Sequence, residues 1–149
     1  FGHAVALQGN VAVIGAPTED NAGGANAGSA YVFLRGKTGW SQQQKLTDAS
    51  GAAEDRFGTA LGLLADVVVV GSPLDDTGFG SDAGTVTQFT KPKGSTSWTA
   101  LPKLNATSAA AGDKFGAAIS LSGNTAVIGA PWDDTPSGNN TGSIHVFIP

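Results

Sequence analysis

The chain has 149 residues, a formal net charge of −4, 40% hydrophobic residues and no cysteine. This length is typical of one domain with a packed core, and the missing cysteines exclude disulfides, thiolate metal sites and a cysteine nucleophile. The acidic balance and the lack of a basic stripe argue against nucleic-acid binding. No apolar run approaches the ~20 residues of a membrane helix, so we expect no membrane insertion.

A gapless segment occurs three times, over residues 1–33, 57–89 and 115–147. Its copies open with FGHAVALQGNVAVIGAP, FGTALGLLADVVVVGSP and FGAAISLSGNTAVIGAP. Repeats of this period indicate solenoids, propellers or arrays, and their spacing suits a small sheet. Because the chain begins and ends inside a repeat, we expect it to be a fragment or a processed product of a longer protein.

Each repeat predicts up to four strands in chain order. A first apolar run (4–7, 60–64, 117–121) and a β-branched run (11–14, 67–70, 125–128) flank a short turn of Gly-Asn or Ala-Asp, which is a hairpin signal. After a polar segment comes a third run (29–33, 85–89, 143–147), and a fourth begins at a tryptophan (40–46, 98–104). The third repeat lacks this outer strand, so we expect 11 strands and essentially no helix.

Four antiparallel strands per repeat predict an all-β fold of propeller blades, with an eleven-stranded β-sandwich as the alternative. Residues 1–149 would form one partial propeller domain, with repeats 1–56, 57–114 and 115–149. We interpret the repeated Phe-Gly pair structurally: the phenylalanine is a wedge between blades, and the glycine permits close backbone approach near the axis. These residues are Phe1, Gly2, Phe57, Gly58, Phe115 and Gly116.

The FG opening, the GAP after a β-branched strand and the later GSAYVF-like and W…QKL-like strands resemble the FG-GAP repeat, the blade motif of the integrin α-chain propeller. The resemblance covers essentially the whole chain. It implies an extracellular or cell-surface module that binds ligands through two kinds of connection. These are the loops between the second and third strands of each blade (2–3 loops) and the segments from the fourth strand of one blade to the first strand of the next (4–1 crossings). Integrin-like blades often carry a DxDxDG calcium loop in the first hairpin, but here that hairpin reads only LQGN, LLAD or LSGN. Calcium is therefore not expected at that position.

Oxygen-bearing side chains recur at three equivalent positions of the 2–3 loops, here called the first, second and third columns of the aligned repeats. In order, the columns are Glu19/Asp75/Asp133, Asp20/Asp76/Asp134 and Asn26/Asp82/Asn140. Asx residues of this kind cap turns, which is the favoured interpretation. The alternative is Ca²⁺, which prefers oxygen ligands. Its candidate ligands would be Asp75, Asp76, Asp82, Asp133, Asp134 and Asn140.

Other polar residues predict little chemistry. Asp55 and Asp113 stand two residues before a Phe-Gly pair, where they would bond backbone NH groups or, alternatively, contact a ligand. His3 and His145 occupy no repeated position, and no nucleophile has a base beside it, so we expect no enzyme. Asn105 and Asn139 stand in N-glycosylation sequons.

Sorting charges by connectivity predicts a disc with two unlike faces. Eleven of the twelve acidic residues, all but Asp66, fall on the side of the 2–3 loops and 4–1 crossings. The candidate ligand-face residues are Glu19, Asp20, Asp55, Asp75, Asp76, Asp113, Asp133 and Asp134. Two functions fit: an adhesion-type module for a protein or glycan ligand, or a structural subunit of a surface assembly. Because three blades leave open flanks, we also expect self-association or completion by the rest of a longer chain.

Overall fold

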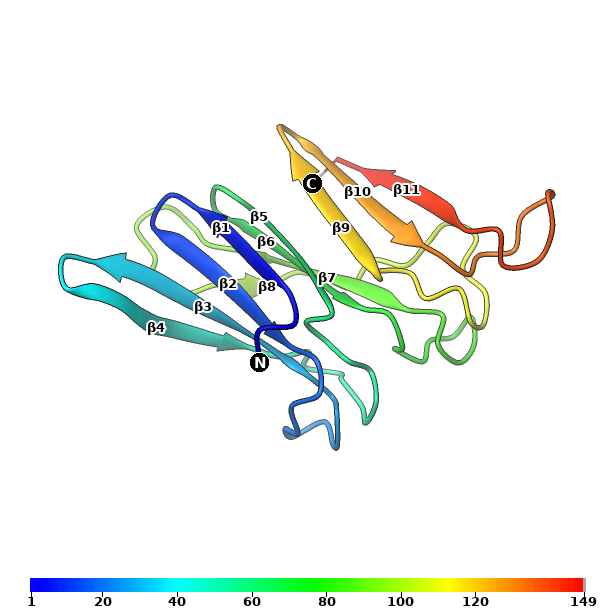
Figure 1. Ribbon diagram of the computed structural model, residues 1–149, viewed down its shortest axis with the longest axis horizontal. Helices are drawn as coiled ribbons and strands as arrows, with labels where there is room; N and C mark the ends of the chain where they lie inside the picture. Colours follow the sequence, from blue (N-terminus) through cyan, green and yellow to red (C-terminus); the bar gives the residue numbers. More distant parts are fainter. Residues whose placement is uncertain (149) are drawn as a thin grey trace.

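The computed structural model describes residues 1–148, which form eleven strands in three antiparallel sheets (Figure 1). The first sheet, blade 1, contains β1 (Val5–Gln8), β2 (Val11–Ala16), β3 (Ser29–Gly36) and β4 (Gly39–Leu46). Blade 2 contains β5 (Ala60–Leu64), β6 (Val67–Ser72), β7 (Thr85–Thr90) and β8 (Thr99–Ala100). Blade 3 contains β9 (Ala118–Ser122), β10 (Thr125–Ala130) and β11 (Ser143–Phe147). The described residues include no helix long and apolar enough to cross a membrane.

The blades stand side by side, with their first strands toward one another. Strand β5 contacts both β1 and β9, and each blade follows the order of the chain, β1-β2-β3-β4 in the first. The predicted all-β fold with blades of four, four and three strands is confirmed, and the sheets do not close into a ring. The long loops extend from one end of the blades and the short hairpins from the other (Figure 1).

The outer strand of blade 2 is shorter than its sequence pattern predicts. The run 98–104 forms only the two-residue strand β8 and, beyond it, an isolated bridge between Val86 and Leu104. Pro102 lies between the two pairings, and proline has no NH to donate to a sheet. In blade 1 the equivalent run has no proline, and β4 pairs with β3 from Gly39 to Leu46 through one register shift.

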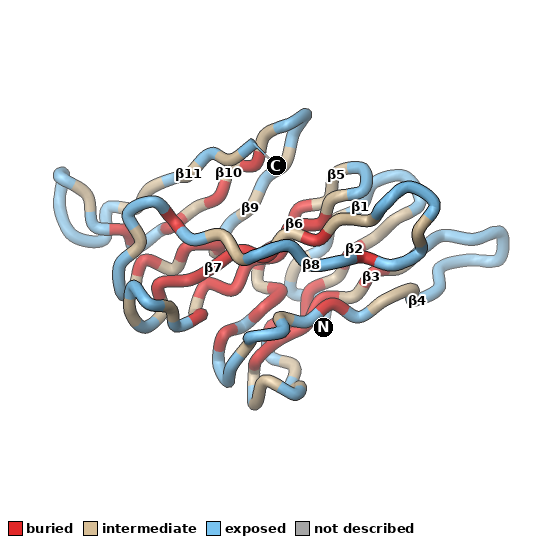
Figure 2. Tube along the Cα trace, turned by 180° about the vertical axis from the view of Figure 1, so that it is seen from behind, coloured by how far each residue is buried: buried red, intermediate tan, exposed pale blue. Residues whose placement is uncertain are grey.

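Burial along the second strands reflects how many neighbours each blade has. In β6 the residues Val68, Val69 and Val70 are all at most 2% exposed, because blade 2 is covered on both faces. In β10 burial alternates along the strand, because blade 3 has a neighbour on one face only. Buried residues accordingly follow the middle strands, whereas β4 and β8 are mainly exposed (Figure 2).

The phenylalanine of the Phe-Gly pair fills the space between adjacent blades. Phe57 is fully buried among side chains of blades 1 and 2, and its ring meets Phe89 edge-on. Phe115 is equally buried between blades 2 and 3. Phe1 faces no preceding blade and is 73% exposed. Likewise Trp98 is buried between blades, whereas its equivalent Trp40 is 45% exposed.

Backbone pairing locks each blade to the one before it. The NH of Phe57 donates to the Ala27 carbonyl at 3.0 Å, and the NH of Phe115 donates to the Ala83 carbonyl at 3.0 Å. At both junctions the following Phe-Gly segment also lies directly against the penultimate residue of the second strand, Gly15 or Gly71. The third equivalent, Gly129, has no following segment against it.

This difference yields a prediction from matched glycines. In Gly71→Ala the new methyl group would overlap the Gly116 carbonyl oxygen. That oxygen belongs to backbone held in the sheet junction, so we expect a loss of about 2–3 kcal/mol of unfolding free energy. In Gly129→Ala the nearest atom is the Ala118 Cβ at 3.4 Å, and the change should stay within about 0.5 kcal/mol. Urea unfolding measures both; equal losses would contradict this packing.

Candidate functional site

The 2–3 loops (residues 17–28, 73–84 and 131–142) and the crossings (residues 47–59 and 105–117) together form one surface, here called the loop face. In each loop a second-column aspartate accepts a hydrogen bond from a backbone NH six residues later, at 2.7–2.9 Å. The donors are Asn26, Asp82 and Asn140, all with φ of 51–52°. This backbone region suits asparagine and aspartate best after glycine. The geometry is that of turn capping.

The first-column acids point away from these caps, toward the third strand of their own blade. Glu19 accepts a hydrogen bond from the Tyr31 hydroxyl, Asp75 from Thr85 and Asp133 from Ser143. The two acidic columns therefore do not converge on a common centre. Of the six residues considered as calcium ligands, only Asp75 joins a group of three carboxylates among the described residues.

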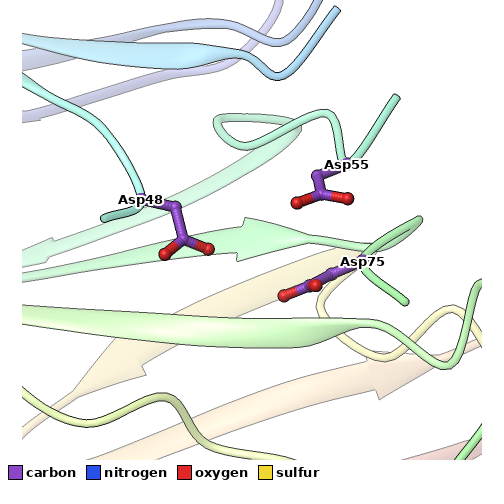
Figure 3. Close-up of side chains that lie close together, drawn as sticks. All are labelled: Asp48, Asp55 and Asp75. Atoms are coloured by element: carbon purple, nitrogen blue, oxygen red, sulfur yellow. The ribbon is translucent and has the colours of Figure 1, made fainter. Parts of the chain in front are cut away.

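That group is a buried acidic centre at the junction of blades 1 and 2. Asp48 and Asp55 of the first crossing and Asp75 of the following loop have carboxylate oxygens within 4.8 Å of one another (Figure 3). The ammonium of Lys103, from the outer edge of blade 2, lies 2.5 Å from both Asp48 and Asp75. The cation of this centre is thus a lysine side chain.

Burial and charge oppose each other in this centre. Burial disfavours the charged form of Lys103, but its contacts with Asp48 and Asp75 outweigh this effect and raise the lysine pKa. Burial also raises the pKa of Asp55, which accepts a hydrogen bond from the Ala52 NH at 2.6 Å. Asp113 repeats this arrangement with the Ala110 NH at 2.7 Å, and burial raises its pKa too. Both aspartates make the backbone contacts expected of them.

The three repeats differ in how the first-column acid is neutralised. In blade 1, Glu19 pairs with Lys45 at 2.6 Å on a partly exposed surface. Burial works against its charged form, but hydrogen bonds from Lys45 and Tyr31 lower its pKa overall. In blade 3, Asp133 lies 3.9 Å from His145 Nε2. Sequence analysis missed Asp48 and Lys103 as partners; the only signal was the equivalence of Lys45 and Lys103.

A pocket of about 210 Å³, here called the central pocket, lies on the loop face between blades 1 and 2 and the two crossings. Four pairs of equivalent positions in successive repeats line it. The pairs are His3/Thr59, Pro17/Pro73, Thr18/Leu74 and Arg56/Lys114. Because equivalent positions of two repeats line the pocket, its shape follows from the repeated backbone. Its chemistry depends on the side chains that differ between the repeats. Sequence analysis did not identify it, although a basic residue stands before the second and third Phe-Gly pairs in the sequence.

Two exposed aromatic side chains also mark the loop face. Phe79 of the β6–β7 loop is 55% exposed, and Trp132 of the β10–β11 loop is 51% exposed. Lys114 Nζ lies 3.6 Å from the centre of the Trp132 ring, a cation–π contact. The sequon residues Asn105 and Asn139 are exposed on the same face.

The acidic centre predicts unequal costs for two equivalent lysine substitutions. Lys103→Met would leave Asp48 and Asp75, with side chains 7% and 6% exposed, without their cation. Removing one partner of a buried ion pair costs about 3–5 kcal/mol. Lys45→Met breaks the more exposed pair with Glu19 and should cost about 1 kcal/mol or less. Urea unfolding at pH 7 compares the two. A smaller loss for Lys103→Met would show that Lys103 is not the essential counter-ion.

Comparison with known proteins agrees with the blade architecture. A family model described as FG-GAP repeat matches residues 1–33, 40–87 and 98–147. A search of curated proteins found no match. The matched residues cover most of the chain, and the second and third matches each begin at the outer strand of one sheet and continue through the first strands of the next. The chain therefore belongs to the FG-GAP repeat family.

Proposed function

We propose that the chain is a non-catalytic binding module of an extracellular or cell-surface protein, and that the loop face takes up a protein or glycan ligand. The observation that carries this proposal is the pairing of a central pocket with two exposed aromatic rings on one face. Large exposed aromatic residues are characteristic of interaction surfaces. FG-GAP repeats occur in integrin-like propeller modules, which supports the same conclusion.

The loop face is suited to binding because its backbone is preorganised. Each loop is capped by its own aspartate, and the crossings pair with the preceding loops at Phe57 and Phe115. A surface already held in its bound conformation loses little conformational entropy when a ligand docks. The buried carboxylates, in turn, are engaged by hydroxyl, backbone or lysine partners. This supports a structural role for them over acid–base catalysis.

The proposal predicts that binding depends on the loop face and not on the opposite, hairpin end. The purified chain would be tested against immobilised extracellular proteins and glycans by biolayer interferometry. Phe79→Ser should weaken binding of any retained ligand at least tenfold, because it removes an exposed aromatic contact. Leu34→Ser, near the β3–β4 hairpin and also exposed, is the control for loss of an exposed apolar side chain and should leave binding unchanged. The opposite pattern would reject the loop face as the ligand surface.

A structural subunit is the second candidate, and the open flanks favour it. One flank presents Phe1 and Trp40, whose equivalents Phe57 and Trp98 are buried between blades. The other presents Gly129 and the 68% exposed Ile144, with a pocket of about 730 Å³ where the next blade would pack. Exposed apolar patches and sheet edges of this kind promote association.

Association can be measured by analytical ultracentrifugation at micromolar concentration. We expect species heavier than the 14.8 kDa monomer, because leaving a phenylalanine in water forfeits about 1.5–3 kcal/mol. Phe1→Glu should shift the chain toward monomer, whereas Phe79→Ser on the loop face should not. A discrete dimer would fit a closed six-bladed binding module, and open polymer would fit a structural subunit. A monodisperse wild-type monomer would refute association through the flanks.

A further inference from the structure

We propose that the central pocket of the loop face binds one carboxylate of a protein ligand, within a segment whose neighbouring residues are basic. This inference rests on the proposed function and deepens it by naming the ligand chemistry. Four observations support it: the basic residues that line the pocket, their backbone conformation, the size of the pocket and the acidic residues around it.

The pocket gathers the two basic residues of the crossings. Arg56 and Lys114 stand at equivalent positions, each directly before a Phe-Gly pair, and both line the pocket. The simplest explanation is that they neutralise nearby acids. Arg56 lies 3.7 Å from Glu54, but both side chains are about half exposed, and such pairs contribute little. Within residues 1–148, Lys114 has no carboxylate at ion-pair distance and lies over Trp132 instead. Neutralisation of a nearby carboxylate therefore does not explain the position of Lys114.

The backbone beneath these two residues is unusual. Arg56 has φ of 56° and Lys114 has φ of 57°, in the region that glycine, asparagine and aspartate occupy more readily. Their NH groups donate to the carbonyls of Asn26 and Asp82, so the tightly paired crossing imposes this conformation. A long basic side chain in both copies of a position suited to glycine indicates a use for its charge.

The pocket is sized for one side-chain group rather than a whole ligand. Its volume of about 210 Å³ is below the ~300–1,000 Å³ typical of sites that enclose a drug-sized molecule. Pro17 and Pro73 supply rigid apolar walls, and the hydroxyl of Thr59 donates to the Arg56 carbonyl at 2.7 Å. A carboxylate is small enough for such a pocket and accepts charge-assisted hydrogen bonds from arginine and lysine.

The surroundings of the pocket decide what can flank that carboxylate. The exposed acids Asp20, Asp76 and Asp134 occupy the loops of the same face, one in each blade. A polyanion, such as an acidic polysaccharide, would be repelled by these loops. A protein segment with lysine or arginine on either side of the carboxylate would be attracted by them. The charge pattern of the face therefore matches a dipolar ligand.

The test uses two peptides that differ in one group, acetyl-KKEKK-amide and acetyl-KKQKK-amide, with fluorescence anisotropy as readout. We expect the wild-type chain to bind the glutamate peptide about 5–10-fold more tightly than the glutamine peptide. Arg56→Gln and Lys114→Gln should each reduce this preference toward 1, because the group that distinguishes the peptides is lost. Lys93→Gln, on the hairpin side, is the matched charge control and should retain the full preference. Thermal melting confirms that each variant is folded.

The outcomes separate this inference from the proposed function. Equal binding of both peptides by the wild-type chain would overturn the carboxylate pocket while leaving a binding role for the loop face. No binding of either peptide would overturn the pocket as well, and the Phe79→Ser comparison would then decide the proposed function on its own. Tighter binding of glucuronate than of the glutamate peptide would replace the protein ligand with an acidic sugar, contrary to the proposal.

Discussion

Close backbone packing between successive blades is the constraint on which the other features depend. The Phe-Gly segment of one blade lies against the loop of the preceding blade and the glycine near the end of its second strand. Hydrogen bonds such as that from the Phe57 NH to the Ala27 carbonyl join the two. Side chains cannot be inserted between the two backbones, so glycine is required at Gly15 and Gly71. The buried phenylalanine then fills the remaining space between the sheets.

The same packing creates the loop face. Because each crossing is paired with the preceding loop, Arg56 and Lys114, the residues before the second and third Phe-Gly pairs, adopt a left-handed conformation and line the pocket of that face. The buried acids beneath the face are neutralised internally, most fully where Lys103 lies between Asp48 and Asp75. The charges of this part of the molecule are therefore separated by depth: Asp48, Asp75 and Lys103 pair with one another where blades 1 and 2 meet, whereas Arg56 and Asp76 are exposed on the loop face.

Variation among the three repeats follows from their unequal surroundings. Blade 2 has neighbours on both faces, and its second strand is buried from Val68 to Ser72. Blades 1 and 3 each expose one flank, and Phe1 and Ile144 lie there in contact with solvent. Equivalent residues thus have different environments. The same substitution at Gly71 and Gly129, or at Lys103 and Lys45, therefore separates the effect of the surroundings on stability from the effect of the residue type.

The sequence by itself determined the repeat, the eleven strands and the division into blades, because hydrophobic alternation and turn dipeptides are local signals. It also located the acidic side of the disc, since connectivity places the loops and crossings at one end of the blades. Only the tertiary structure decided how these residues combine. Asp48, Asp75 and Lys103 are distant in the chain and meet where two blades join. Arg56 and Lys114 share a pocket because successive crossings converge near the axis, and this convergence depends on blade packing that no local pattern encodes.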